Sequence, residues 1–304
     1  MMRPRLFPIV VAAGLLAAGV ASAQEPQGDA GEHADILVQG EAIRAPDEVR
    51  AAVRHMSEPL ALDEPLVRFL DPLCLSVSGL GKQGGETVRL RIEANAREAG
   101  LSVAKPGCTA NALVLVVDDP AALIERIVDE QPWLISQGER RRVAARLSAG
   151  ERVLDWHNEQ QRSAEGGTLA QMATVPGLGG SASPLRWGGP VNTQGRPRRV
   201  GLSHSTAAAS AVVVFDIENL VGMDLERVAD HATMRLLAPG FRNVGRREAA
   251  GLASVLDPFA PEEGAPELTR FDRAYLSALY ALRPNTPATR LPNAVADAYG
   301  DGAD

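Results

Sequence analysis

Two hydrophobic patterns alternate along this chain: short continuous apolar runs, and longer stretches with apolar residues at helical spacing. The run Ala211–Asp216 predicts a buried strand, and it leads into Asp224–Leu237, where apolar residues recur every three or four positions. Asp224 stands at the N-cap position of this predicted helix. We therefore expect a core strand followed by a core helix.

The same alternation occurs earlier in the chain. Two predicted strands, Leu73–Leu80 and Asn111–Asp118, are each followed by a predicted helix, at Glu86–Ala99 and Pro120–Pro132. This order predicts a strand–helix–strand–helix unit in an α/β or α+β fold, followed by a mainly helical part built around Ala211–Asp216. Additional predicted elements are a strand at 36–38, a helix at 47–56, a helix at 139–147, a strand at 153–161, and helices at 246–256 and 269–282.

A shift to glycine and proline after Ser163 predicts a domain boundary. The expected segments are a signal peptide at 1–23, a disordered lead-in at 24–34, an α/β domain at 35–162, a Gly/Pro-rich linker or mobile loop at 163–205, a strand plus helical domain at 206–292, and a frayed tail at 293–304.

The first residues have the pattern of a cleaved export signal. Arg3 and Arg5 precede the apolar stretch Phe7–Val20, and Ala21-Ser22-Ala23 is a small-x-small cleavage sequence. No later stretch approaches the roughly 18 apolar residues of a membrane-spanning helix. We expect a mature chain that begins near Gln24, is periplasmic or secreted, and has no transmembrane segment after signal removal.

Cysteine usage agrees with that location. The chain has two cysteines, Cys74 and Cys108, and an even pair in an oxidising compartment indicates a disulfide. Closing a loop of this size stabilises a fold by roughly 4 kcal/mol in the chain-entropy model. A free catalytic thiol is the alternative.

Composition excludes some classes of function. A hydrophobic fraction of 45% is enough for a substantial core, and a formal net charge of -7 argues against nucleic acid as a partner. The remaining partner classes are an envelope protein or a small ligand.

Motifs for catalysis or cofactors are weak. Gly79–Gly84 spells G-x-G-x-x-G between a predicted strand and helix, but the next acidic residues, Asp118 and Asp119, lie too far along for the dinucleotide pattern. Ser203 lacks the second glycine of a nucleophile elbow. No His or Cys spacing matches a metal motif, so we predict no cofactor. A site could still assemble in space from the histidines at 157, 204 and 231.

Several of these stretches resemble a group of secreted alphaproteobacterial proteins that share a domain of unknown function. The similar stretches are Cys74–Asp118, with Gly100-Leu101-Ser102-Val103 and Gly107-Cys108-Thr109-Ala110-Asn111 inside it, Val228–Arg235, and Leu268–Leu276. The resemblance implies export, a disulfide and an α/β fold. It implies no catalytic residue.

A more distant likeness is to zincin-like secreted bacterial proteins, in which a strand and an active-site helix precede a late helix beginning Leu-Thr-x-Phe-Asp. Asp224–Leu237 stands where their metal-binding helix would be, but it carries Glu226 and His231 in place of H-E-x-x-H. The likeness implies a zinc site that has been lost.

Two hypotheses follow. The first is an exported protein without a catalytic site that acts by binding or assembly in the cell envelope. The alternative is a degenerate zincin-like metallohydrolase that binds zinc at a diverged site around His231, with Glu226 as its base.

Overall fold

The computed structural model describes residues 44–58, 60–171, 190–191, 201–241, 252–256 and 265–301, with the backbone alone at 170–171 and 190–191. The residues from Ile43 to Asp304 belong to one compact unit. The predicted signal peptide, the lead-in and the strand at 36–38 lie outside the described residues.

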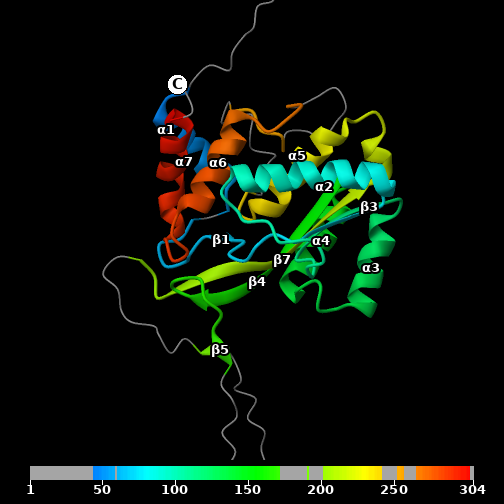
Figure 1. Cartoon of the computed structure of the whole chain (residues 1–304), viewed down its shortest axis with the longest axis horizontal. Coiled ribbons are helices and arrows are strands. Elements are labelled where there is room, and N and C mark those ends of the chain that lie inside the picture. Colours follow the sequence, from blue (N-terminus) through cyan, green and yellow to red (C-terminus); the bar gives the residue numbers. More distant parts are fainter. Residues whose placement is uncertain are drawn as a thin grey trace, which may run out of the picture. The chain divides into compact units, whose positions relative to one another are not determined.

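A mixed sheet of five strands forms the centre of this unit (Figure 1). Its strands are β1 (Val67–Arg68), β2 (Leu75–Ser78), β3 (Ala112–Val117), β4 (Val153–Ser163) and β7 (His204–Asp216). The strands β2, β3 and β7 lie side by side and parallel, and β1 pairs parallel with the first half of β7. Along its other edge β7 pairs antiparallel with β4. A separate two-stranded sheet joins β5 (Ala170–Gln171) to β6 (Pro190–Val191).

The central position of β7 follows from its sequence. Because side chains alternate between the two faces of a strand, a strand at the centre of a two-sided core must be apolar at successive positions. In β7, Val213 packs in the core on one face, whereas Val212 and Val214 pack in the core on the other. The continuous apolar run Ala211–Phe215 therefore predicts this position as well as the strand.

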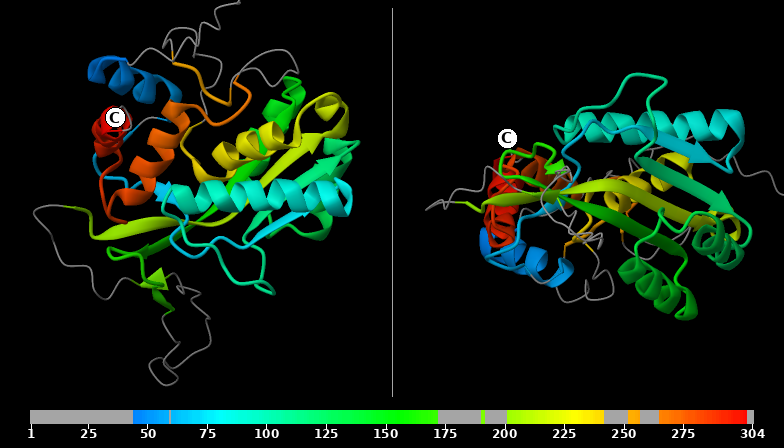
Figure 2. Two further views of the ribbon diagram at one scale, coloured as in Figure 1. Left: turned by 45° about the horizontal axis from the view of Figure 1, so that its top comes forward. Right: turned by 90° about the horizontal axis from the view of Figure 1, so that it is seen from below.

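Helices cover both faces of the sheet and one of its ends. They are α1 (Pro46–Met56), α2 (Gly81–Glu98), α3 (Pro120–Glu130), α4 (Gln137–Ser148), α5 (Leu225–Leu237), α6 (Arg270–Ala281) and α7 (Leu291–Asp301), with 3-10 turns η1 (Ile217–Leu220) and η3 (Ala288–Arg290). Figure 2 shows α3 and α4 on the side of the sheet opposite to α2. The helices α2 and α5 pack against each other, while α7 packs against both α1 and α6.

The predicted N-cap at Asp224 is confirmed. The carboxylate of Asp224 accepts a hydrogen bond from the backbone N–H of Glu226 at the start of α5 (3.2 Å). At the start of α6, Thr269 and Asp272 form a capping box, in which each side chain accepts from the backbone N–H of the other. The disulfide between Cys74 and Cys108 is also present, with a Cα–Cα distance of 6.1 Å, and it ties the start of β2 to the loop before β3.

The two segments predicted as separate domains share one sheet. Because β7 pairs with β3 over its whole apolar half and with β4 over nearly its full length, the strand of the second segment completes the sheet of the first. The Gly/Pro-rich composition after Ser163 thus marks the connection between two paired strands. Residues 172–189 and 192–200 of the predicted linker lie outside the described residues.

Other boundaries also differ from the predictions. The tail at 293–304 was expected to fray, but α7 extends to Asp301 and buries Val295 and Tyr299, one turn apart on one face. Residues 252–256, predicted to end a helix, are coil and turn; the rest of that prediction, 246–251, lies outside the described residues. Helix α2 starts at Gly81 rather than at Glu86 as predicted. Within the G-x-G-x-x-G stretch, positive φ angles occur only at Gly79 and Gly81, and the chain is helical after them. Most of the G-x-G-x-x-G stretch is therefore the first turn of a helix.

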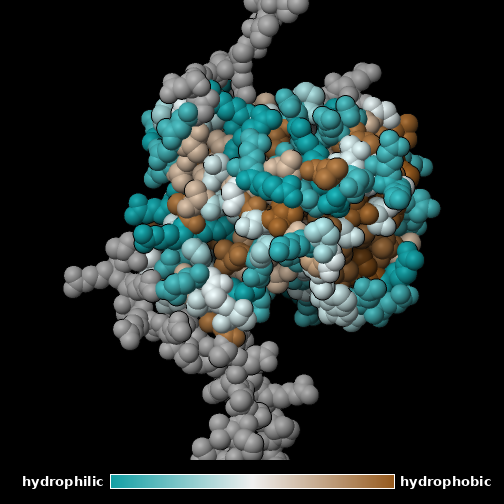
Figure 3. Space-filling model, in the orientation of Figure 1, coloured by the Kyte–Doolittle hydropathy of each residue, from teal (hydrophilic) through white to brown (hydrophobic). Residues whose placement is uncertain are grey.

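Apolar surface is unevenly covered. Figure 3 shows apolar residues at the surface between α2 and α3, and the apolar side chains of β3 that face α3, Leu113, Leu115 and Val117, are only half-buried. Among the described residues no helix combines the length and apolar character needed to cross a membrane.

Candidate functional site

His231, the predicted metal ligand, is buried on the side of α5 that faces the sheet. Its ring packs edge-on against Phe215, with centroids 6.0 Å apart. Nδ1 donates to the carbonyl of Val255 (3.1 Å), and Nε2 accepts from Nε of Arg235 (3.3 Å). Burial, reinforced by the charge of Arg235, lowers the pKa of His231 to about 3. The imidazole is therefore neutral, and both of its nitrogens are already engaged.

The structure does not bring Glu226 to His231. They are five positions apart on α5, which places their side chains roughly 140° apart around the helix. Glu226 is exposed in the first turn, whereas His231 is buried. The two candidate site residues consequently do not form a common site.

The other histidines are also dispersed. His157 lies on β4 opposite Ala211, and His204 lies opposite Ser163 at the other end of the β4–β7 pair, about 20 Å along the strands. In the described part of the chain no group of three or more His, Cys, Asp or Glu side chains is arranged to hold a metal ion.

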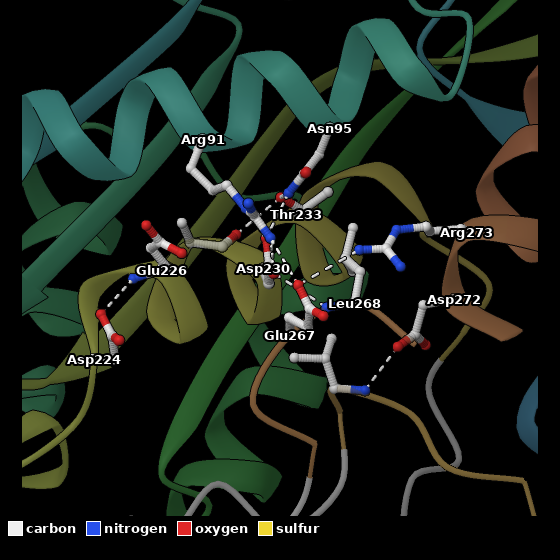
Figure 4. A network of polar contacts seen from close by, with 12 residues as sticks. Arg91, Asn95, Asp224, Glu226, Asp230, Thr233, Glu267, Leu268, Asp272 and Arg273 are labelled. Atoms are coloured by element: carbon white, nitrogen blue, oxygen red, sulfur yellow. Dashed lines mark hydrogen bonds and ion pairs between the residues drawn. The ribbon is translucent and has the colours of Figure 1, made fainter. Parts of the chain in front are cut away.

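One turn after Glu226, Asp230 forms the centre of a buried polar network (Figure 4). Arg91 binds both of its oxygens, Nε to Oδ1 and Nη2 to Oδ2, at 2.8 Å each. Asn95 Nδ2 donates to Oδ1 (2.7 Å), and the backbone N–H of Leu268 donates to Oδ2 (3.0 Å). Four donors fill the acceptor sites of a carboxylate, so Asp230 joins α2, α5 and the start of α6 and has little capacity left for a ligand.

A second set of ionisable side chains follows β4. Asp155, His157 and Glu159 occupy alternate positions: Asp155 contacts Arg235 and His157 contacts Leu236, both on α5. Glu159, which follows an irregularity in the β4–β7 register, lines a cavity together with residues just after α5. Asp155 is buried and accepts from Nη2 of Arg146 (2.9 Å) and Nη1 of Arg235 (3.2 Å). Burial opposes its ionisation, but Arg235 and Arg146 outweigh that effect and lower the pKa of Asp155.

The middle residue of this stripe is held by the end of α5. His157 is buried, and its Nε2 donates to the carbonyl of Leu236 (3.0 Å), while its Nδ1 has no hydrogen-bond partner among the described residues. Burial lowers the pKa of His157, against the opposing effect of Asp155, so this imidazole is also neutral.

Glu159, the outer residue of the stripe, reaches a cavity of about 90 Å³. The cavity lies where the segments around α1, β1, β4, α5, α6 and α7 converge. Its lining comprises three carboxylates, a phenol and an apolar remainder: Glu58, Glu64, Glu159, Tyr275, Leu60, Pro65, Leu66, Val67, Pro239, Gly240, Leu279, Ala288 and Leu291. No lysine or arginine is among these lining residues.

Backbone hydrogen bonds fix the walls of this cavity. The N–H of Glu58 donates to the carbonyl of Gly240 (2.8 Å), and the N–H of Ala288 donates to the carbonyl of Glu64 (2.9 Å). Beside this second bond, Pro65 forms an antiparallel bridge with Pro287. Two of the three carboxylates are therefore attached to backbone whose position is set by the fold.

The electrostatics of the cavity mouth differ from those of the buried networks. Glu64 and Glu159 are exposed and form no ion pair within the described part of the chain, whereas Glu58 pairs with Arg142 (3.4 Å). The pKa of Glu159 is raised by partial loss of hydration and by the neighbouring carboxylates Glu139 and Glu58, against a smaller opposing effect of Arg142. Burial raises the pKa of Tyr275 to about 12, so its hydroxyl stays protonated. The mouth therefore carries negative charge that the fold leaves largely uncompensated.

A second, larger hollow of about 840 Å³ lies beside η3 and α7. Its charged lining residues have mixed signs, with Arg283 and Arg290 against Glu165 and Asp297. This mixture selects no class of ligand, and we therefore take the acid-lined cavity as the candidate site.

The sequence gives no signal of this site. Within the predicted strand 153–161, Asp155, His157 and Glu159 alternate with Leu154 and Trp156, and such alternation predicts that the polar set faces solvent. The structure instead buries Asp155 and His157, because residues on both faces of β4 are covered. Glu58, Glu64 and Tyr275 have no signal either, because they come from segments far apart in the chain.

In comparison with known proteins, no family model matches the chain, and no curated protein or solved structure matches it either.

Proposed function

We propose that this is an exported protein of the cell envelope, periplasmic or secreted, that acts by binding or assembly without covalent chemistry, and that it holds its ligand in the acid-lined cavity. One observation carries the proposal. The carboxylates of Glu64 and Glu159 border a partly apolar cavity with fixed walls, and no described residue pairs with them. Groups kept at a cavity mouth without internal partners are available to a ligand.

Two observations support the export part of the proposal. The first residues have the charge and apolar pattern of a signal peptide, and Cys74–Cys108 is a type of bond that persists in oxidising compartments. The resemblance to secreted bacterial proteins points the same way.

No observation among the described residues favours the zinc-dependent alternative. Metal binding would need a free nitrogen lone pair on His231, and Arg235 donates to the lone pair that the neutral ring offers. Glu226, its proposed base, is on another side of the helix.

The proposal can be tested by mapping small fragments onto the protein. The mature chain, residues 24–304, is labelled at its leucine, valine and alanine methyl groups and titrated with neutral, anionic and cationic fragments of similar size. We expect fragment-induced NMR shifts at the methyl groups of Leu66, Leu279 and Leu291. A cavity-filling variant, Ala288→Met, should abolish these shifts while keeping the circular dichroism spectrum.

Two results would overturn the proposal. The first is that no fragment of any charge shifts these three leucines. The second is stoichiometric zinc in protein purified from the periplasm without chelator, lost in the His231→Ala variant, because that would restore the metallohydrolase hypothesis.

A further inference from the structure

We infer that the acid-lined cavity takes a primary ammonium group on a short apolar stem, the chemistry shared by a lysine side chain and the end of a free alkyl diamine. This inference rests on the proposed function, since it assigns a ligand class to the same cavity.

The charge at the mouth sets the sign of the ligand. Glu58, Glu64 and Glu159 all line the cavity, and no lining residue that the structure describes is cationic. Lost hydration, and after it the repulsion of nearby carboxylates, raises the pKa of Glu159, although Arg142, which pairs with Glu58, opposes this effect. A cation at the mouth relieves the repulsion, whereas an anion increases it.

The arrangement of the acids sets the shape of the cationic group. They come from three separate segments: Glu58 follows α1, Glu64 precedes β1, and Glu159 is on β4. An ammonium presents three N–H donors on one compact centre, which suits acceptors that approach from different directions. A guanidinium is planar and is bound best by a carboxylate that takes two of its donors in one plane.

The remainder of the cavity sets the stem. Its other walls are mainly apolar, with Leu66, Leu279 and Leu291 buried among them. A bare metal ion would gain nothing from such walls, and the described acids do not form a metal-binding group. A volume of about 90 Å³ greatly exceeds the roughly 10–15 Å³ that one water needs. An apolar stem of a few carbons can therefore lie against the leucines while its ammonium remains at the mouth.

The test compares three probes of equal length: n-butylammonium, n-butanol and butyrate. Binding is followed through the methyl groups of Leu66, Leu279 and Leu291 at low salt. We expect n-butylammonium to bind about tenfold more tightly than n-butanol, as a charge-assisted contact at a half-exposed site requires, and butyrate not to bind. Affinity for n-butylammonium should fall as salt is added.

Matched variants locate the effect. Glu159→Gln together with Glu64→Gln removes two charges from the mouth and should reduce n-butylammonium affinity to that of n-butanol. Glu125→Gln removes an exposed charge from α3, on the other face of the sheet, and should leave the affinity unchanged. Equal binding of all three probes, or an unchanged affinity in the double variant, would overturn the ammonium assignment but leave the cavity as a binding site. If no probe reaches the three leucines, the proposed function fails as well.

Two further probes distinguish the sources of the ammonium. Nα-acetyl-lysine methylamide carries the backbone of a protein lysine, and 1,5-diaminopentane is a free diamine. Binding of the lysine derivative at least as tight as that of n-butylammonium supports the lysine side chain of a partner protein. Binding of the diamine alone supports a free diamine, because the peptide groups are then excluded by the walls.

Discussion

Asp230 and Glu159 are carboxylates in the same compact unit, but they differ in burial and in the number of partners that the fold provides. Asp230 is buried, and four donors from α2 and from the segment before α6 converge on it. Glu159 is exposed at a cavity mouth, and its neighbours Glu58 and Glu139 are also acids. The first arrangement contributes to stability, because Arg91 and Asn95 compensate a carboxylate that is fully buried. The second opposes stability, and under our proposal a ligand supplies the missing charge.

The largest expected effect on stability is at Asp230, whose acceptor sites are all occupied. Asp230→Ala leaves the buried amide of Asn95 and the N–H of Leu268 without their acceptor, whereas the part-exposed Arg91 can turn to water. At about 1–3 kcal/mol for each unsatisfied buried donor, we expect a loss of roughly 2–4 kcal/mol in the free energy of unfolding. Urea denaturation measures this loss. Glu226→Ala is the control, because Glu226 is exposed on the same helix and its removal should change stability by no more than about 0.5 kcal/mol. A loss below 1 kcal/mol for Asp230→Ala would mean that the network is not a structural unit.

The second prediction concerns pH and the buried histidine beside this network. The folded state holds His231 at a pKa of about 3, below the ordinary histidine value of 6.5, so between these values the unfolded chain binds the additional proton. Stability therefore falls as pH decreases through this window, by about 2 kcal/mol between pH 7.5 and pH 5 from His231 alone. His157, whose pKa is also lowered by burial, adds to the fall.

Denaturation at several pH values tests this dependence. In the His231→Asn variant, whose amide can still donate to the carbonyl of Val255, the slope between pH 7.5 and pH 5 should be clearly smaller. An identical slope in wild type and variant would show that His231 is solvated and can be protonated at little cost.

More of the region around Asp230 than of the cavity could be predicted from the sequence. The position of β7, the Asp224 cap and the disulfide follow from local rules: an apolar run, a capping residue and an even cysteine pair. Each depends on residues close together in the sequence or, for the disulfide, on the number of cysteines. These features fix the elements that Asp230 joins.

The rest depended on long-range contacts that no local pattern encodes. The first half of β7, rich in serine, threonine and alanine, lacks an apolar run and becomes a strand because β4 pairs with it. The burial of Tyr299 in α7 likewise requires α1 and α6 to be in place. Predicting the cavity requires knowing that Glu64, Glu159 and Tyr275 meet, and these residues are separated by about a hundred positions each.

The smallest expected effect is a gain in stability, opposite in sign to the loss expected for Asp230→Ala. It tests most directly whether Glu159 and Asp230 differ in how the fold compensates their charge. Glu159→Gln removes a charge from a mouth where like charges are crowded, so it should stabilise the protein without ligand. Because Glu159 is exposed and solvent screens its interactions, we expect a gain of only a few tenths of a kcal/mol. Thermal unfolding at low salt measures it, with Glu125→Gln as the control for loss of one exposed acid.

The pH dependence of that gain separates repulsion from other causes. The folded pKa of Glu159 is raised above the value in the unfolded chain, so the folded state takes up its proton first as pH falls. Once Glu159 is protonated it is as neutral as glutamine, and the advantage of the variant should disappear in acid and also at high salt. A gain that persists under both conditions would reflect side-chain packing. A loss of stability at neutral pH would mean that the fold already compensates Glu159, and the contrast with Asp230 would no longer identify a binding site.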